Sequence, residues 1–225
     1  RFFLERNAPG REDWQNLIGA MAALPNGPCF SILLPTYNTE PKLLREAVES
    51  VRSQIYPNWE LCIADDASTR RATLRTLRKI EVSDDRIKVS YRKENGHISE
   101  ASNTALEMAT GEWVGLLDHD DLLLPQSLAR VALEIRRHPG ARFVYSDEDK
   151  IDIRGKPLSP YFKPDWNPVF LFSQNYVCHF TCMRRADVNQ IGGFRKGLEG
   201  SQDWDLFLRL GKNLKPSMVR HIPEV

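Results

Sequence analysis

Apolar runs of strand length alternate with amphipathic segments of helix length between residues 29 and 146, and this alternation constrains the fold more than any other feature. The runs are short and almost wholly apolar, which is typical of strands buried on both faces. Such strands need helices over both faces of the sheet, so the pattern predicts an α/β fold with a mainly parallel sheet. The predicted strands are Phe30–Leu34, Trp59–Ala64, Ile87–Tyr91, Trp113–Leu117 and Phe143–Tyr145. The inner faces of the predicted helices lie within Leu43–Val51, Leu74–Ile80, Ile98–Met108 and Leu128–Ile135.

Helix boundaries can be predicted from local signals. Thr39 is a candidate cap for the first of these helices, with Pro41 in its first turn. Gly111 is expected to end the third, and Asp121 is a candidate cap for a helix beginning near Leu123.

The remaining segments are less regular. Residues 1–28 are expected to form a helical arm that packs on the core, touches a membrane surface or meets a neighbouring domain. Residues 29–225 are expected to form one domain, with a first half to about residue 121 and a second half after it. Because the chain begins at Arg1 rather than Met and stops after a predicted strand, we expect a piece of a longer polypeptide. The arm's helix is marked by Trp14, Leu17, Ile18 and Met21, and the second half holds a predicted hairpin at Arg154–Gly155, strands at His179–Met183 and Met218–Ile222, and a helix at Asp203–Leu210.

Charge and motif content exclude several classes of function. Lys and Arg number 31 against 30 Asp and Glu, whereas a protein that coats nucleic acid needs a basic surplus. The sequence lacks a glycine-rich dinucleotide fingerprint, a P-loop and a G-x-S-x-G elbow, which disfavours dinucleotide oxidoreductases, P-loop enzymes and α/β-hydrolases. It also lacks a signal peptide and an apolar run of membrane-spanning length, so a cytoplasmic location or one at the inner face of a membrane is expected.

Polar and acidic residues follow the predicted strands, at the sheet edge where open parallel sheets bind ligands. Clustered carboxylates repel one another unless a cation or hydrogen-bond donors compensate them, and oxygen ligands of this kind suit Mg²⁺ or Mn²⁺. The residues in question are Pro35, Thr36, Tyr37 and Asn38, then Asp65, Asp66, Ala67 and Ser68, then Lys93, Asn95 and Gly96, then Asp118, His119, Asp120 and Asp121, and finally Ser146, Asp147, Glu148 and Asp149.

Each of these groups has a structural interpretation beside the functional one. Asp118 and Asp120 are predicted metal ligands, whereas Asp121 serves equally well as a helix cap. Asp65 and Asp66 either form a turn or accept hydrogen bonds from a nucleobase. The Asn95-Gly96 pair is either a plain turn or a helix start that approaches a ligand closely.

Several stretches, in the right order, resemble the family 2 glycosyltransferases, a group with the GT-A fold. The resemblance covers roughly residues 29–210, and each stretch alone is a weak signal. The stretches are Ile32–Asn38, Leu61–Ser68, Asn95-Gly96 with Ala101–Asn103, Gly111–Asp121, and Ile191–Phe194 with Gln202–Asp205.

The resemblance implies a nucleotide-diphosphate sugar donor, with UDP expected before dTDP or GDP, and inversion at the anomeric carbon. Carried over residue by residue, Asp65 or Asp66 would bind the base beside Pro35, Thr36 and Tyr37, with Asn95 and Gly96 also at the donor. Asp118 would contact the ribose or the metal, and Asp120 would bind Mn²⁺ or Mg²⁺. Asp203 would be the general base that deprotonates the acceptor hydroxyl, unless it is only an acid placed at a helix N-terminus.

The sequence departs from the family pattern at a few points. Gln202 and Ser102 stand where many relatives carry Glu and Arg, and a final segment in which relatives often place a metal-binding His is missing after Val225. A non-catalytic donor-binding module of a larger synthase is therefore the alternative, with a nucleotidyltransferase behind it. The acceptor is expected to be a glycan or lipid-linked glycan, and aromatic or imidazole side chains at Tyr161, Phe162, Trp166 and His179 either line its groove or pack in the core.

Overall fold

The computed structural model describes residues 10–22, 27–152 and 155–225. Its centre is a seven-stranded sheet in the order β3-β2-β1-β4-β6-β5-β7. All strand pairs are parallel except those of β6, which runs antiparallel to both of its neighbours. The predicted α/β fold, mainly parallel with a small antiparallel part, is confirmed. The strands are β1 (Phe30–Thr36), β2 (Trp59–Asp65), β3 (Ile87–Tyr91), β4 (Trp113–Leu116), β5 (Phe143–Ser146), β6 (Thr181–Arg184) and β7 (Val219–Ile222).

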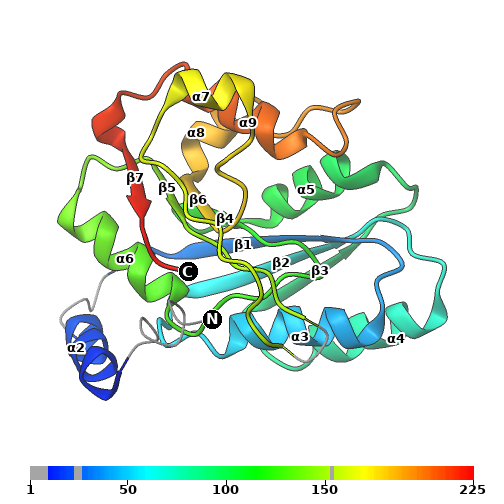
Figure 1. The fold of residues 1–225 in the computed structure, drawn as a ribbon. Helices are drawn as coiled ribbons and strands as arrows, with labels where there is room; N and C mark the ends of the chain where they lie inside the picture. The colour runs from blue at the N-terminus through cyan, green and yellow to red at the C-terminus, as the bar shows by residue number, and fades with distance from the viewer. Residues whose placement is uncertain (1–9, 23–26, 153–154) are drawn as a thin grey trace.

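Helices cover both faces of the sheet (Figure 1). One face carries α3 (Pro41–Arg52), α4 (Arg71–Glu81) and α6 (Ser127–Arg137), and the other carries α5 (His97–Met108), α8 (Arg185–Gln190) and α9 (Gln202–Gly211). Two hydrophobic clusters result, one on each side of the strands. The remaining described helices are α2 (Arg11–Ala22), α7 (Pro168–Ser173) and the short 3₁₀ helix η1 (Pro216–Met218).

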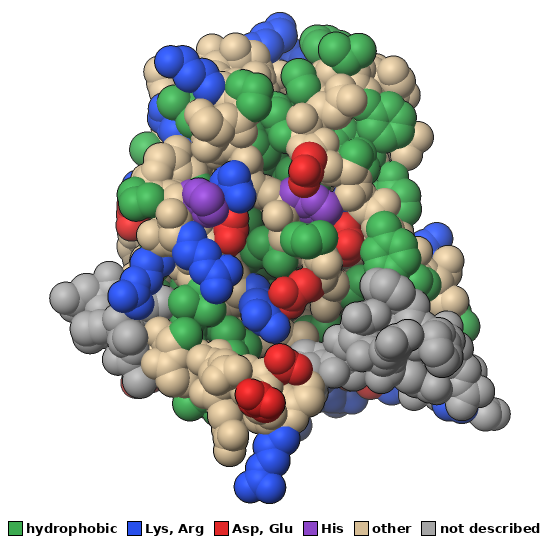
Figure 2. Space-filling view, turned by 60° about the vertical axis from the view of Figure 1, so that its left-hand side comes forward, with side chains coloured by type: hydrophobic (Ala, Val, Ile, Leu, Met, Phe, Trp, Pro, Cys, Tyr) green, Lys and Arg blue, Asp and Glu red, His purple; other side chains and the backbone are tan. Residues whose placement is uncertain are grey.

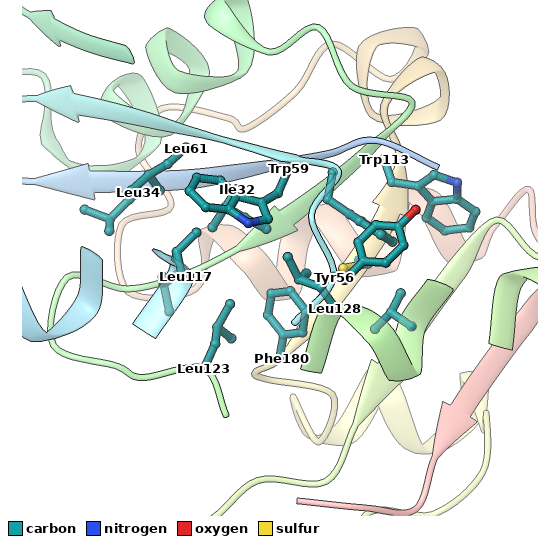
Figure 3. Packing of buried hydrophobic residues seen from close by; sticks show 14 of the residues in the cluster. Ile32, Leu34, Tyr56, Trp59, Leu61, Trp113, Leu117, Leu123, Leu128 and Phe180 are labelled. Atoms are coloured by element: carbon teal, nitrogen blue, oxygen red, sulfur yellow. The ribbon is translucent and has the colours of Figure 1, made fainter. Parts of the chain in front are cut away.

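The first cluster is filled by large side chains from strands, helices and loops that are far apart in sequence. Leu34, Leu117, Leu123 and Phe180 lie on one side of strands β1 and β2, and Leu128 of α6 belongs to the same cluster (Figure 3). Burying a side chain of this size contributes about 1.5–3 kcal/mol. Segments that are far apart in the sequence therefore stabilise the same face of the sheet.

Pro35 lies inside β1, a position that proline normally avoids because it has no N–H to donate. The carbonyl of Leu33 accepts a hydrogen bond from the Leu117 amide, and the carbonyl of Thr36 accepts one from the Asp66 amide. The backbone N–H and C=O groups of odd-numbered residues in β1 therefore point toward β4, and those of even-numbered residues point toward β2. Pairing of β1 with β4 ends at Leu33. The missing N–H of Pro35 thus points past the end of β4, where no ladder bond is lost.

The reversed direction of β6 determines what stands at the edge of the sheet. Leu116 at the end of β4 pairs with Thr181 at the start of β6. The segment that leads into β6 therefore reaches the carboxyl end of β4, next to Asp118. A parallel strand in this place would have brought its own carboxyl end there instead.

Two of the predicted caps are wrong. Glu40 occupies the N-cap of α3, with Pro41 at the start of the helix as predicted, because the hydroxyl of Thr39 is turned inward to that of Thr36 at 2.6 Å. Asp121 caps no helix, since α6 begins only at Ser127.

Two smaller predictions also fall on described residues, and a third falls partly outside them. Helix α5 ends at Met108, before the expected stop at Gly111. The predicted arm helix is present as α2 and packs against α6, with Leu17 buried. The tip of the predicted hairpin includes Arg154, which lies outside the described residues.

The molecular surface mixes charges of both signs. Figure 2 shows Lys and Arg side chains beside Asp and Glu side chains on the face that it turns forward. Some of these charges form ion pairs between α6 and the C-terminal segment. Arg220 Nε lies 2.8 Å from Glu134 Oε1, and Arg130 Nε lies 2.9 Å from Glu224 Oε2. Among the described residues, no helix is both long and apolar enough to cross a membrane.

Candidate functional site

A pocket opens where the carboxyl ends of β1 and β4 meet the entry to β6 and the start of α9. It brings together three of the residues predicted from sequence: Pro35 of β1, Asp118 after β4 and Asp203 of α9. His179 joins them from the segment before β6. The other lining residues are Leu33, Ile98, Ser102, Leu116, Leu117, Phe194 and Gln202.

Two residues of this pocket, Asp118 and His179, form with the neighbouring Asp121 a group that could hold a metal ion. One ligand atom from each residue lies within 4.8 Å of the other two, and His179 Nε2 lies 3.5 Å from Asp118 Oδ2. The second imidazole nitrogen, Nδ1, is buried and has no hydrogen-bond partner in the described structure. Asp120, the second carboxylate of the predicted pair, is exposed on the same turn and is not part of the group.

The charges in this group favour the arrival of a cation. Burial raises the pKa of Asp121, and the imidazole of His179 opposes this rise. Neighbouring carboxylates add to the rise, namely those of Asp118, Asp120 and Glu148. A divalent cation would remove this repulsion, and carboxylate oxygens of this kind suit Mg²⁺ or Mn²⁺. The residues present therefore fit the metal that the sequence predicts.

Asp65 and Asp66, which are equivalent in the sequence, differ in the structure. Both are buried. Asp66 Oδ1 accepts from Arg92 Nε and from the Gly96 amide, both at 2.9 Å. Asp65 Oδ2 accepts from the Ser68 amide at 3.1 Å, while its Oδ1 has no partner. Burial raises the pKa of Asp65. Hydrogen bonds from Ser68 oppose this rise, and the negative charge of Asp66 adds to it.

The Asn95-Gly96 pair closes the loop between β3 and α5 onto Asp66. Asn95 is exposed, and its amide nitrogen donates to the Asp66 carbonyl at 3.1 Å. Gly96 is buried, and a Cβ at this position would lie 2.6 Å from the Arg92 guanidinium and 2.7 Å from Glu100. Glycine is thus required for close packing around Asp66, a role that the sequence could not separate from ligand contact.

The loop after β1 is tied to the loop after β2 through Asn38, whose role the sequence did not reveal. Its Oδ1 accepts from the amides of Thr69 and Arg70 at 2.9 and 2.8 Å, and its own amide donates to Ser68 Oγ at 2.7 Å. Thr36 is buried against Thr39, while Tyr37 is 48% exposed at the rim. The loop thus presents the Tyr37 ring to solvent on a fixed backbone.

Backbone strain gathers at this edge. Among the described residues other than glycine, those with positive φ are Asn38, Ala67, His97 and Cys178. The first three follow β1, β2 and β3, and Cys178 precedes His179. Conformations of this kind cost about 1–3 kcal/mol each and are retained where the surrounding structure enforces them, often at functional sites.

Asp203 stands in the first turn of α9 and is held from outside its helix. Asn175 Nδ2 donates to Asp203 Oδ2 at 2.8 Å. Asp205 has a different role, because it accepts from Arg209 Nε at 2.8 Å and from Arg195 Nε at 3.1 Å. Asp203 is therefore the carboxylate of α9 that faces the pocket, and Asp205 anchors the helix.

A reciprocal hydrogen-bonded pair joins α5 to the glycine-rich turn before α9. Asn103 donates to the Phe194 carbonyl and accepts from the Phe194 amide, both at 2.8 Å. Gly193 has a φ of +67°, and a Cβ there would lie 2.5 Å from Asn103 Oδ1. This contact gives the stretches around Asn103 and Gly193 a shared structural role, because each supplies one side of the same hydrogen-bonded pair.

The aromatic side chains proposed for the acceptor groove are divided between core and surface. Trp166 packs on Phe143, with ring centroids 5.6 Å apart, and Tyr161 accepts a hydrogen bond from Gln174 at 2.9 Å. Phe162 is 49% exposed. His179 has joined the acidic group instead.

The sheet order, the acidic edge and the antiparallel β6 define a GT-A fold. The profile of Glycosyl transferase family 2 matches residues 31–192, and the chain belongs to this family. TarS of S. aureus, residues 1–349 in complex with UDP-GlcNAc, is similar with a TM-score of 0.72 and 25% identity over 88% of this chain and 56% of that chain.

Curated relatives are similar to this chain over a minor part of their own length. O-antigen biosynthesis protein RfbC of Myxococcus xanthus is 39% identical over 205 residues, which are 91% of this chain and 16% of RfbC. Chondroitin synthase of Escherichia coli is 32% identical over 192 residues, 85% of this chain and 28% of the synthase. The chain thus spans about a fifth of the length of relatives of this kind.

Proposed function

We propose that this domain transfers a sugar from a nucleotide-diphosphate sugar, with UDP as the first candidate nucleotide, to a hydroxyl group of a glycan or lipid-linked glycan. The observation that supports the proposal best is that Asp118 and His179, which form a group with Asp121, line one pocket with Asp203. Metal ligands for a diphosphate and a carboxylate for an acceptor hydroxyl are the two functions such a transfer needs. The binding of UDP-GlcNAc by TarS and the names of the polysaccharide synthases support it.

At the donor end, Asp65 would accept a hydrogen bond from the nucleobase at its free Oδ1. Pro35, Thr36 and Tyr37 would border the base, with Asn95 and Gly96 closing the neighbouring loop. Asp66 has its acceptor oxygens engaged by Arg92 and Gly96, so it supports the loop. This assigns separate roles to two neighbouring carboxylates.

At the reacting end, Asp118, Asp121 and His179 would hold Mn²⁺ or Mg²⁺, and Asp120, exposed on the same turn, would contribute less. The metal would neutralise charge that develops on the diphosphate leaving group. Asp203 would take the proton of the attacking acceptor hydroxyl. A single carboxylate acting as a base, with direct attack by the acceptor, leads to inversion at the anomeric carbon.

Calorimetric titration with UDP, dTDP and GDP, with and without Mn²⁺, tests the donor site. We expect Mn²⁺-dependent binding of one nucleotide, with loss of most of it in Asp118→Asn. The exposed Asp85→Asn variant, at the opposite edge of the sheet, is the matched control and should bind as the unchanged chain does. Absence of binding to all three nucleotides would refute the proposal. Binding without sugar transfer or donor hydrolysis, even in the longer native chain, would favour a non-catalytic donor-binding module.

A further inference from the structure

Lys163 is a lysine whose side chain is fully enclosed, next to the candidate site but outside it. Its exposed fraction is 0%. Nζ donates to the carbonyls of Val177 and His179 at 2.7 and 2.5 Å and lies 3.0 Å from Glu148 Oε2. An ammonium has three hydrogens to donate, and each of these acceptors takes one.

Such an arrangement is costly for stability alone. Burial lowers the pKa of Lys163, and the charge of Glu148 opposes that effect. Replacing a buried ion pair by apolar groups is often neutral or stabilising, so a buried pair is weak evidence for a contribution to stability. What the ammonium does here is satisfy two backbone carbonyls of the turn that enters β6.

Glu148 holds the same turn from its other side. Its Oε2 accepts from the His179 amide at 3.1 Å, while Lys163 donates to the His179 carbonyl. Both backbone polar groups of His179 are therefore fixed by one ion pair. Lys163 is itself held through its own amide, which donates to Asp147 Oδ1 at 2.9 Å.

The held segment carries two side chains of the candidate site. Asn175 reaches Asp203, and His179 reaches Asp118. Cys178 between them has a φ of +41°, a conformation that unsupported backbone leaves readily. A small shift here would move the imidazole away from the carboxylates. Because metal ligands need placement within about 0.5 Å, such a shift would weaken metal binding.

We propose that Lys163 is a positioning residue, which with Glu148 fixes the backbone at residues 177–179 so that His179 stands in the metal-binding group. This inference rests on the proposed function, because it assumes that the group binds a metal with the donor. It concerns how the imidazole is held and adds no chemical step.

The test measures binding of UDP by calorimetry in Mn²⁺ and in EDTA, and of Mn²⁺ by electron paramagnetic resonance, for the unchanged chain and Lys163→Met. We expect Mn²⁺ affinity to fall by about tenfold or more, the usual cost of losing a supporting partner of a metal ligand. Binding of UDP in EDTA should be unchanged, because Asp65 lies apart from the turn.

Lys88→Met is the matched control. Lys88 also pairs with a glutamate, Glu60 at 2.6 Å, and also donates to a carbonyl, that of Met108 at 3.2 Å. Its partner Glu60 lies at the amino end of β2, at the opposite edge of the sheet. This variant should keep the Mn²⁺ affinity even if its melting temperature falls.

A double-mutant cycle separates positioning from general stability. If Lys163 acts through His179, Lys163→Met should add little to the loss already caused by His179→Ala, whereas independent effects would add. Should Lys163→Met fail to fold, Lys163→Gln keeps a donor for one carbonyl and should give an intermediate Mn²⁺ affinity. Unchanged Mn²⁺ affinity in a folded Lys163 variant, or full additivity, would overturn the inference while leaving the proposed function standing. Failure of the unchanged chain to bind Mn²⁺ or a nucleotide would remove both.

Discussion

The side-chain amide of Asn175 donates a 2.8 Å hydrogen bond to Oδ2 of Asp203, across 28 residues of sequence. The bond engages Oδ2 and restrains the plane of the carboxylate. If Asp203 is the proposed base, Oδ1 would be the oxygen that accepts the proton of the substrate hydroxyl, and such a constraint would favour transfer from a defined direction.

Asn175→Ala is therefore expected to lower kcat about tenfold, the value of one hydrogen bond to a charged group, while leaving the donor KM within about twofold. Steady-state transfer kinetics with a saturating donor would measure the split. The exposed Asn213→Ala serves as control. A rise in donor KM with an unchanged kcat would place Asn175 at the donor and not at the base.

The carboxylates after β4 are predicted to contribute unequally to metal binding. Asp118→Asn and Asp121→Asn should each weaken Mn²⁺ binding about 10–100-fold, because both belong to the group that includes His179. Asp120→Asn should have a smaller effect, since its side chain is exposed outside that group. Mn²⁺ titration followed by electron paramagnetic resonance ranks the three, and a dominant effect at Asp120 would require the turn to rearrange when the metal binds.

Asp65 and Asp66 should separate in their effects on binding and stability. Asp65→Asn is expected to weaken UDP binding about tenfold with little loss of stability, because its Oδ1 has no protein partner. Asp66→Asn should instead lower the free energy of unfolding by about 2–3 kcal/mol, since it leaves the Arg92 guanidinium and the Gly96 amide poorly matched. Calorimetry and urea denaturation test the two effects, and the reverse pattern would exchange the roles.

Sequence periodicity was sufficient for most of the sheet because β1, β2, β4 and β5 are mostly apolar and buried along almost their whole length, while Ile87, Val89 and Tyr91 alternate along β3. The two wrong caps, Thr39 and Asp121, have different causes. The hydroxyl of Thr39 is turned to that of Thr36, and the segment after Asp121 becomes helical only at Ser127. Local capping signals carry no information about either arrangement.

The candidate site was predictable in part for a related reason. Asp118 and Asp203 come from recognisable stretches, and the pocket brings them together. The joining of His179 to Asp118 depends on the direction of β6, which a four-residue strand does not reveal. Lys163 gave no signal, because a lysine in a loop is normally solvated, and only the three-dimensional structure places it beneath the turn.

A further prediction concerns stability at low pH. Burial would raise the pKa of Glu60, but hydrogen bonds from Lys88, Ser31 and Thr110 outweigh it and hold the pKa at about 2, below the ordinary 4.5. A carboxyl group with a lowered pKa in the folded state stabilises the fold above its unfolded pKa, and the contribution is lost as the pH falls from about 5 toward 2. Because its partner Lys88 is partly exposed and solvent screens the pair, we expect this contribution to be about 1–2 kcal/mol at neutral pH.

Glu60→Gln should therefore unfold more easily than the unchanged chain at pH 7, and the difference should shrink steadily as the pH falls toward 2. Urea denaturation at a series of pH values measures it. The exposed Glu107→Gln is the control, with no expected change across the series. A difference that stays constant with pH would mean that the loss reflects packing rather than the charge of Glu60.

The reversal of β6 also has an evolutionary consequence. The chain leaves the sheet after β5 and returns to it at β6, and the two strands pair directly, so the excursion over residues 147–180 is closed by the sheet itself. Lengthening a loop with fixed ends costs little free energy, about 0.6 kcal/mol for each doubling. Insertions at the exposed residues 155–159, ahead of Lys163, can therefore accumulate at little cost to the sheet. Under the proposed function, relatives could in this way vary the partner they modify while the donor site stays the same.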